Sequence, residues 1–160
     1  MAELGKGDKA PDFELPRDGG GTLRLSAFRG KPVVLYFYPK DDTSGCTAEA
    51  LDFSARKGEF DAIGVAIVGV SPDTPKSHDK FKAKHGLAID LASDTEKNVL
   101  QAYGVWTEKS MYGRKYMGVE RSTFLIAPDG SIAEAWRKVS VPGHVETVLE
   151  AAKKLSAGSA

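Results

Sequence analysis

The stretch "KPVVLYFYPKDDTSGCTAEA", residues 31–50, decides the fold, and it holds the chain's only cysteine, Cys46. Residues 31–39 are too continuously apolar for a strand with one wet face, and they suit a strand covered on both faces. From Cys46 to about Phe60, small and apolar residues recur at helical spacing between charged ones. The stretch therefore predicts a central buried strand, a short loop and a helix whose first turn contains Cys46.

Strands are predicted on both sides of this unit. Residues 12–28 offer two short extended segments on either side of Gly19–Gly21, which is typical of a hairpin. Residues 63–72 indicate a second buried strand, and residues 122–137 indicate two strands joined by a Pro-Asp-Gly turn. Residues 143–155 form an amphipathic pattern that predicts a closing helix.

Two more helices are predicted from their end signals. The first has Thr74 as its cap, Pro75 at its first position and Gly86 just past its end. The second spans residues 93–105, with Ser93 as its cap and a glutamate three residues later, which is capping-box spacing. Alternating strands and helices that end in a hairpin and a helix predict an α/β fold, a mixed sheet with helices on both faces.

Size and charge favour one domain, residues 1–160, that acts on a small partner. A chain of 160 residues buries roughly 68–70% of its unfolded surface, enough for one core. Its 22 Lys and Arg balance its 22 Asp and Glu, so no global field attracts nucleic acid or an acidic membrane. No apolar run approaches the ~20 residues that span a bilayer. A single cysteine forms no internal disulfide, and no secretory signal is evident, so we expect a cytoplasmic protein.

The position of Cys46 suits reactive chemistry. A thiol ordinarily has a pKa of about 8.5, and the free amides of a first helical turn, with nearby cations, favour the reactive thiolate. Pro39 and Gly45 let backbone approach a small substrate, while the Thr43 hydroxyl can donate and accept hydrogen bonds. Taken singly, these residues also fit a strand stop, a turn, a helix cap and an inert buried thiol. Their joint spacing, P-x-x-x-T-x-x-C at the mouth of a βα unit, favours function.

These motifs resemble the peroxiredoxins, and among them the group named after the bacterioferritin comigratory protein. The likeness runs through "GDKAPDFELP", "VVLYFYPKDDTSGCT", "IVGVSPDTP", "YGVW", "RSTFLIAPDG" and "GHVETVL", nearly the whole chain. It implies a thioredoxin-like three-layer sandwich with an N-terminal β-hairpin extension. It also implies a cofactor-free peroxidase, active in antioxidant defence, that reduces hydrogen peroxide and alkyl hydroperoxides through a cysteine thiolate and a sulfenic acid.

The resemblance assigns roles to four residues. Cys46 matches the peroxidatic cysteine, Thr43 the hydroxyl that orients the peroxide, and Pro39 the residue that shields the sulfur. Arg121 matches the cation of the site, and an arginine suits this task because its planar fork can bond sulfur and peroxide oxygen together. Attack on the O–O bond moves negative charge onto the leaving oxygen, which amides and a guanidinium stabilise.

Three further residues are expected at the substrate side of the site. Glu49 matches a position that supports the arginine in this group, and the Gly45 amide is suited to bind the peroxide. Trp106, in "YGVW", is expected to lie near the site, although aromatic residues more often pack in a core.

The chain departs from the family in its cysteine content. Many members of the group carry a second cysteine five residues after the first, where this chain has Leu51. Such a pair is separated by about 7.5 Å of helical rise and about 140° of rotation, so bridging it requires unwinding. We therefore expect a one-cysteine cycle completed by an external thiol such as thioredoxin, glutaredoxin or glutathione. Ser44 stands where the group often has proline, and we expect this difference to change the mechanism little. Relatives are often monomers, and a monomer is expected here.

Two rival functions use the same cysteine. In a cysteine hydrolase, His78, His85 or His144 would activate Cys46; His78 and His85 fall in a charged helix, where solvated surface is expected. A redox sensor or holdase would instead undergo one stoichiometric oxidation. A metal site is not expected, because one cysteine and three scattered histidines form no ligand spacing.

Overall fold

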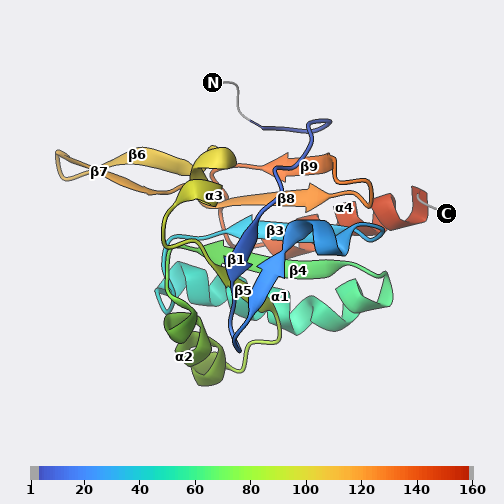
Figure 1. Cartoon of the computed structure of the whole chain (residues 1–160), viewed down its shortest axis with the longest axis horizontal. Coiled ribbons are helices and arrows are strands. Elements are labelled where there is room, and N and C mark those ends of the chain that lie inside the picture. Colours follow the sequence, from blue (N-terminus) through green and yellow to red (C-terminus); the bar gives the residue numbers. More distant parts are fainter. Residues whose placement is uncertain (1–3, 159–160) are drawn as a thin grey trace.

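A five-stranded mixed sheet forms the centre of the protein in a computed structural model that describes residues 4–158. Strand β3 (Val33–Phe37) is the middle strand, and all of its residues are buried. It runs parallel to β4 (Ala66–Ser71) and antiparallel to β8 (Ser122–Ile126). The prediction of a central buried strand is confirmed (Figure 1).

The edges of the sheet are formed by two shorter strands. β5 (Asp90–Ser93) runs parallel to β4, and β9 (Ile132–Trp136) runs antiparallel to β8. The Asp129 carboxylate accepts the N–H of Ser131 in the turn between β8 and β9. The predicted Pro-Asp-Gly hairpin is thereby confirmed.

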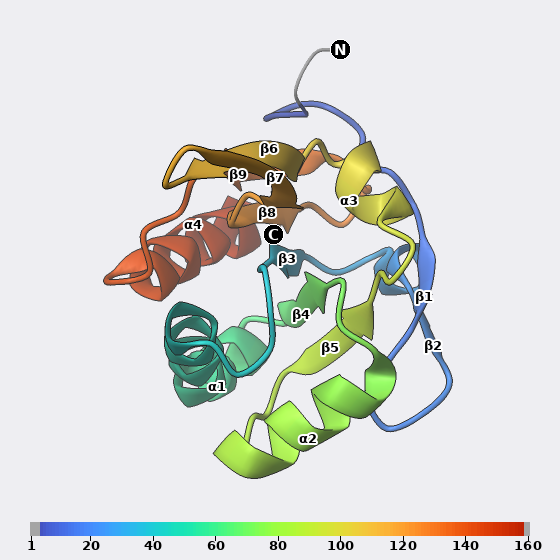
Figure 2. The same ribbon diagram turned by 90° about the vertical axis from the view of Figure 1, so that its left-hand side faces the viewer.

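The long helices cover one face of the sheet. Figure 2 shows α1 (Ser44–Ala62) and α4 (His144–Gly158) side by side there, and α2 (Pro75–His85) beside the β5 edge. All three contribute buried side chains, including Phe53, Phe81 and Val148, to a single core cluster. All three helices were predicted.

The second face is covered mainly by short elements. These are β1 (Glu14–Pro16), β2 (Thr22–Arg24), the 3₁₀ helix η1 (Leu25–Phe28) and α3 (Asn98–Ala102). β1 and β2 pair antiparallel, which confirms the predicted N-terminal hairpin. Their apolar side chains pack with those of β3 in a second core cluster. The sheet is therefore covered on both faces.

The helix predicted over residues 93–105 is wrong in extent and in its cap. Ser93 is the last residue of β5 and pairs with Ser71 of β4, so it cannot cap a helix. The Asp94 carboxylate instead accepts the N–H of Leu100, at 2.7 Å. The helix, α3, begins only at Asn98, because ladder pairing in β5 overrides the local capping signal.

A second hairpin, β6 (Trp106–Met111) and β7 (Arg114–Val119), was not predicted. Tyr112 and Gly113 form its two-residue turn, with φ values of 52° and 77°. This is the backbone of a type I′ turn, for which Asn-Gly is the usual signal. Because tyrosine occupies the first position of this turn, the sequence lacks the Asn-Gly signal and the hairpin was not predicted. The β6–β7 hairpin projects from the body of the molecule at the upper left of Figure 1.

The proposed domain, residues 1–160, includes residues 1–3 and 159–160, which lie outside the described part of the chain. Within residues 4–158, none of the helices has the length and apolar character needed to cross a membrane.

Candidate active site

Cys46 lies in the first turn of α1, where the strand, loop and helix unit predicts it. Thr43 has the extended backbone of an N-cap, with φ −89° and ψ 156°, and Cys46 is the third residue after it. The first amides of a helix lack intrahelical acceptors and carry the positive end of the helix dipole. Cys46 is free and 2% exposed. Cys46 therefore lies among the first amides of α1.

Arg121 reaches this sulfur from a distant part of the chain. It immediately precedes β8, whose antiparallel pairing with β3 brings its guanidinium to the start of α1. Its Nη2 donates a hydrogen bond to Cys46 Sγ at 3.3 Å, and its Nη1 donates to Glu49 Oε1 at 2.6 Å. The guanidinium thus forms a fork that joins the sulfur to a carboxylate one helical turn further on.

Burial affects the pKa values of both Glu49 and Arg121. The Glu49 side chain is fully buried, and that of Arg121 is 16% exposed. Burial raises the pKa of Glu49 to about 7, although the guanidinium opposes the shift. Burial opposes the charge of Arg121 as well, but Glu49 and Cys46 prevail and raise its pKa. Glu49 Oε2 has no hydrogen-bond partner among the described residues. Arg121 therefore stays charged beside the sulfur.

The loop before α1 carries the other predicted residues. A Cβ atom added at Gly45 would lie 3.2 Å from Arg121 Nη2, so glycine leaves room for the guanidinium. The Thr43 hydroxyl donates to the Lys40 carbonyl at 2.8 Å and makes no capping bond. Pro39 is half-buried just after β3. The roles of these three residues at the site stay predictions.

Trp106 lies elsewhere. It begins β6 and packs against the core on the face opposite to Cys46, with the Lys97 ammonium 5.8 Å from its ring centre. None of the contacts described for residues 4–158 joins it to Cys46. A role for Trp106 in the site stays a prediction.

Two further buried residues, Tyr36 and His144, lie next to the site. Burial, then Glu49 and Cys46, raise the pKa of Tyr36, whose hydroxyl has no partner among the described residues. His144 Nε2 and the Thr123 hydroxyl form a hydrogen bond of 2.8 Å. Burial and, to a lesser degree, Arg121 lower the pKa of His144 to about 4, so it is a neutral base.

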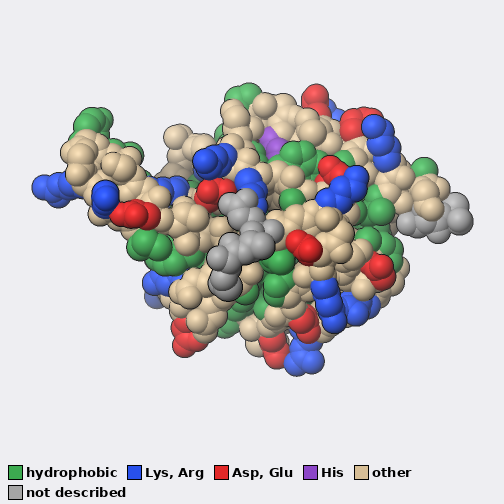
Figure 3. Space-filling view, turned by 90° about the horizontal axis from the view of Figure 1, so that it is seen from above, with side chains coloured by type: hydrophobic (Ala, Val, Ile, Leu, Met, Phe, Trp, Pro, Cys, Tyr) green, Lys and Arg blue, Asp and Glu red, His purple; other side chains and the backbone are tan. Residues whose placement is uncertain are grey.

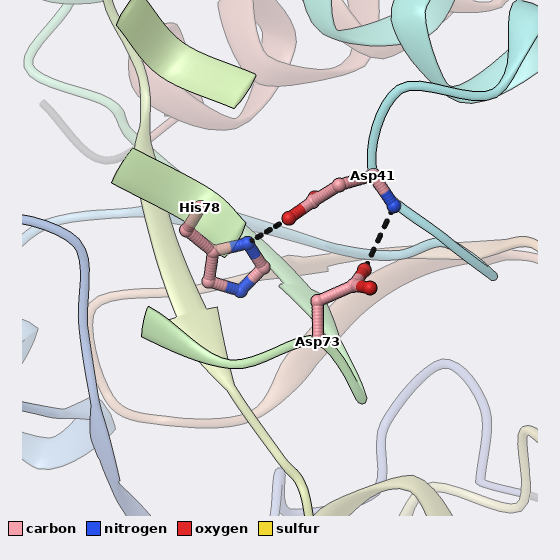
Figure 4. Close-up of side chains that lie close together, drawn as sticks. All are labelled: Asp41, Asp73 and His78. Carbon is pink, nitrogen blue, oxygen red and sulfur yellow. Dashed lines mark hydrogen bonds and ion pairs between the residues drawn. The ribbon is translucent and has the colours of Figure 1, made fainter. Parts of the chain in front are cut away.

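A buried network anchors the loop between β3 and α1. Asp41 Oδ1 accepts from the Tyr38 hydroxyl at 2.6 Å, and Oδ2 accepts from the Ser77 hydroxyl at 2.7 Å. Figure 4 shows His78 pointing its Nδ1 at the same carboxylate, while the Asp41 amide donates to Asp73. The loop that leads to Cys46 is thereby tied to α2.

The expectation that His78 and His85 lie on solvated surface is wrong for His78. Its side chain is fully buried, because the Asp41 carboxylate and the Ala92 carbonyl bind its two ring nitrogens. His85 is 22% exposed and bonds Asp42 at 2.8 Å. Helical periodicity alone did not reveal these acidic partners, which lie on another segment.

Asp41, Asp73 and His78 also present three potential metal ligands, whose atoms lie within 4.8 Å of one another. The chemistry of this set fits hydrogen bonds better than a cation. Nδ1 of His78 lies only 2.7 Å from Asp41 Oδ2, which leaves no room for an ion between them. Asp73 Oδ2 already accepts from the Asp41 amide and the Ser71 hydroxyl.

Comparisons with known proteins show the family and the fold of the chain. The model of the AhpC/TSA family matches residues 6–135. Peroxiredoxin Bcp of Bacillus subtilis is 49% identical over 150 residues, covering 94% of this chain and 96% of the relative. The bacterioferritin comigratory protein of Xanthomonas campestris, whose structures address alkyl peroxide reduction, is 49% identical with a TM-score of 0.86, covering 90% and 92% of the two chains. A PrxQ mutant from Xylella fastidiosa is 41% identical with a TM-score of 0.90, and both chains are fully covered.

Proposed function

The chain belongs to the AhpC/TSA family and is a thiol-dependent peroxidase, and we propose that Cys46 is the sulfur that attacks the peroxide. One observation carries the proposal: Arg121 donates to Cys46 Sγ at 3.3 Å while Glu49 holds its other nitrogen at 2.6 Å. A guanidinium fixed in this way can bond the attacking sulfur and a peroxide oxygen together.

The reaction is the transfer of one oxygen atom. The Cys46 thiolate attacks one peroxide oxygen, an S–O bond forms and the O–O bond breaks. The leaving oxygen departs as water or an alcohol after it takes a proton, and Cys46 becomes a sulfenic acid. Arg121 and the first amides of α1, including that of Gly45, stabilise the charge that develops on the leaving oxygen. The Thr43 hydroxyl orients the peroxide, and Pro39 shields the sulfur from water.

The cycle is completed by an external thiol. The sequence has no second cysteine, and Leu51, where many relatives have one, is 41% exposed on α1. A thiol of thioredoxin, glutaredoxin or glutathione would attack the sulfenic acid, form a mixed disulfide and release water, and a second thiol would then reduce that disulfide and free Cys46. We further propose that residues 1–160 act as one monomeric domain in the cytoplasm, where such thiols are kept reduced.

The peroxidase is favoured over a cysteine hydrolase by the positions of the histidines. The side chains of His78 and His144 bond Asp41 and Thr123, and no histidine among residues 4–158 bonds Cys46 in the described contacts. A hydrolase would need such a base.

Peroxide consumption by the wild type and by Cys46→Ser tests the proposal. The wild type should turn over hydrogen peroxide and an alkyl hydroperoxide many times with added thiol, and Cys46→Ser should not. Mass spectrometry after one equivalent of peroxide should show one added oxygen or a mixed disulfide at Cys46. A single stoichiometric oxidation without turnover would favour the redox sensor, and an active Cys46→Ser variant would refute the proposal.

A further inference from the structure

The exposed apolar surface of this protein is concentrated on the β6–β7 hairpin. Five large apolar side chains are exposed in the described part of the chain, and four of them, Met111, Tyr112, Tyr116 and Met117, belong to this hairpin. Figure 3 shows the hairpin as an arm at the left, with green apolar, blue cationic and red acidic atoms along it. Apolar side chains gathered on one projecting element mark an interaction site.

The two faces of the hairpin differ in charge. Residues that pair across antiparallel strands share a face, and the pairs are Met111 with Arg114 and Lys109 with Tyr116. These four residues, which we call the basic face, include two cations and no carboxylate. The opposite face contains Lys115, whose charge is matched by Glu108 at 3.9 Å. The basic face therefore suits a partner that is apolar with acidic groups at its edge.

The turn residue Tyr112 is unfavourable for the fold of the hairpin itself. It is 98% exposed and has a φ of 52°, a backbone region that bulky residues rarely adopt and that asparagine or glycine would fill at lower cost. A residue that opposes local preference without packing against the protein fits a role in binding.

The base of the hairpin shares a cleft with Arg121, the residue that bonds Cys46. An open cleft of about 360 Å³ is lined by Thr107 and Lys109 of β6 together with Glu120 and Arg121. Figure 2 looks onto this end of the molecule and shows the hairpin above the loop that leads from β3 to α1. A partner that lies along the basic face therefore reaches the end of the molecule where Cys46 is held.

We propose that the basic face and Tyr112 form the docking surface for a protein dithiol that reduces oxidised Cys46. The partner is a small protein with an exposed dithiol in an apolar surface edged by carboxylates. This proposal rests on the proposed peroxidase function. It selects a protein reductant over a small thiol, because a small thiol needs no extended apolar platform. A bilayer would contact the tip alone, whereas the basic face extends from the tip to the cleft.

A single dithiol supplies both electrons that the reduction needs. One partner thiol attacks the Cys46 sulfenic acid, which forms a mixed disulfide and releases the oxygen as water. The second partner thiol attacks that disulfide, so Cys46 leaves as a thiol and the partner becomes a disulfide. The partner is oxidised by two electrons and gives up two protons.

Adjacent residues on opposite faces of β7 provide a matched test. Steady-state turnover of hydrogen peroxide is measured with thioredoxin, recycled by its reductase and NADPH, and separately with dithiothreitol. Arg114→Glu should raise the KM for thioredoxin about tenfold, since it reverses a charge at the docking surface. Lys115→Glu, on the other face, should change it less than about twofold. Dithiothreitol needs no docking surface, so its KM should not distinguish the two variants.

Tyr112→Asn tests the apolar part of the surface. Asparagine suits the type I′ turn, so the hairpin is expected to fold at least as well, while the KM for thioredoxin should rise several-fold. Leu51→Gln removes an exposed apolar side chain elsewhere and should leave that KM unchanged.

Several results would overturn the docking proposal while leaving the peroxidase intact. These are turnover with dithiothreitol but not with thioredoxin, equal effects of Arg114→Glu and Lys115→Glu, or an unchanged KM in Tyr112→Asn. Binding of the wild type to anionic phospholipid vesicles, or dimerisation that Tyr112→Asn abolishes, would assign the hairpin to another partner. Failure of the wild type to consume peroxide with either reductant would instead refute the proposed function.

Discussion

His78 Nδ1 lies 2.7 Å from Asp41 Oδ2, inside the protein and 37 residues away along the chain. The other ring nitrogen, Nε2, lies 2.9 Å from the Ala92 carbonyl. A carbonyl and an ionised carboxylate both accept hydrogen bonds, so this geometry favours hydrogen on both ring nitrogens, as in an imidazolium. Burial opposes this charge, but the bond to Asp41 prevails and raises the pKa of His78.

His78→Gln is expected to destabilise the protein by about 3–5 kcal/mol near pH 6, because it leaves the Asp41 carboxylate buried without its cation. Urea denaturation monitored by circular dichroism measures the change. His85→Gln is the matched control in the same helix, where the exposed pair with Asp42 contributes little. Equal losses in the two variants would contradict the importance of the buried pair.

The contribution of His78 to the free energy of unfolding should also depend on pH. Because the pKa is raised in the folded state, the stabilisation is fully present below the ordinary value of about 6.5 and is lost as pH rises through the folded value. The difference in unfolding free energy between wild type and His78→Gln should therefore narrow from pH 6 to pH 9. A constant difference over this range would show that His78 acts by packing alone.

His144 should make the stability of the fold depend on pH in the opposite direction. Its pKa of about 4 means that the folded state excludes a proton that the unfolded chain binds below about 6.5, so stability is lost as pH falls from 6.5 to 4. Partial solvent contact reduces the full linkage value, and we expect a loss of about 1–2 kcal/mol. In His144→Gln this loss should disappear from urea curves taken at pH 7 and pH 4.5. A loss identical to that of the wild type would assign the acid sensitivity to other groups.

Arg121→Ala should slow the oxidation of Cys46 by peroxide about 10²–10³-fold, the usual cost of removing a donor to a developing oxyanion. Arg121→Lys keeps the charge but cannot bond Cys46 and Glu49 with one planar fork, so it should recover only part of the rate. Stopped-flow measurement of single-turnover oxidation checks both variants. Wild-type rates in Arg121→Lys would show that charge alone is required.

The parts of the fold that sequence predicted are those specified by local physics. The continuous apolar run of β3 needs cover on both faces whatever its neighbours are. Helix α2 contains its own start and stop, since the Thr74 hydroxyl accepts the Ser77 N–H and Gly86 adopts a left-handed φ of 64°. These signals involve residues a few positions apart, so the sequence displays them directly.

The parts that sequence missed depend on partners far along the chain. Ser93 carries a sound capping signal, but pairing with β4 places it in a strand. His78 lies in a charged segment, and its burial follows from Asp41 on another loop. The fork between Cys46 and Arg121 depends on the register of β3 with β8, so only family resemblance predicted it.

Thr43 allows a test that separates chemistry from helix capping. Its hydroxyl donates to the Lys40 carbonyl and makes no capping bond to α1, although the backbone occupies the N-cap position. Thr43→Val should therefore leave stability nearly unchanged while slowing Cys46 oxidation about tenfold or more, because the peroxide loses the hydroxyl that orients it. Thr43→Ser keeps the hydroxyl and should retain most of the rate. Single-turnover oxidation and urea denaturation measured on both variants decide the matter: a large loss of stability with an unchanged rate would make Thr43 a helix cap and remove it from the site.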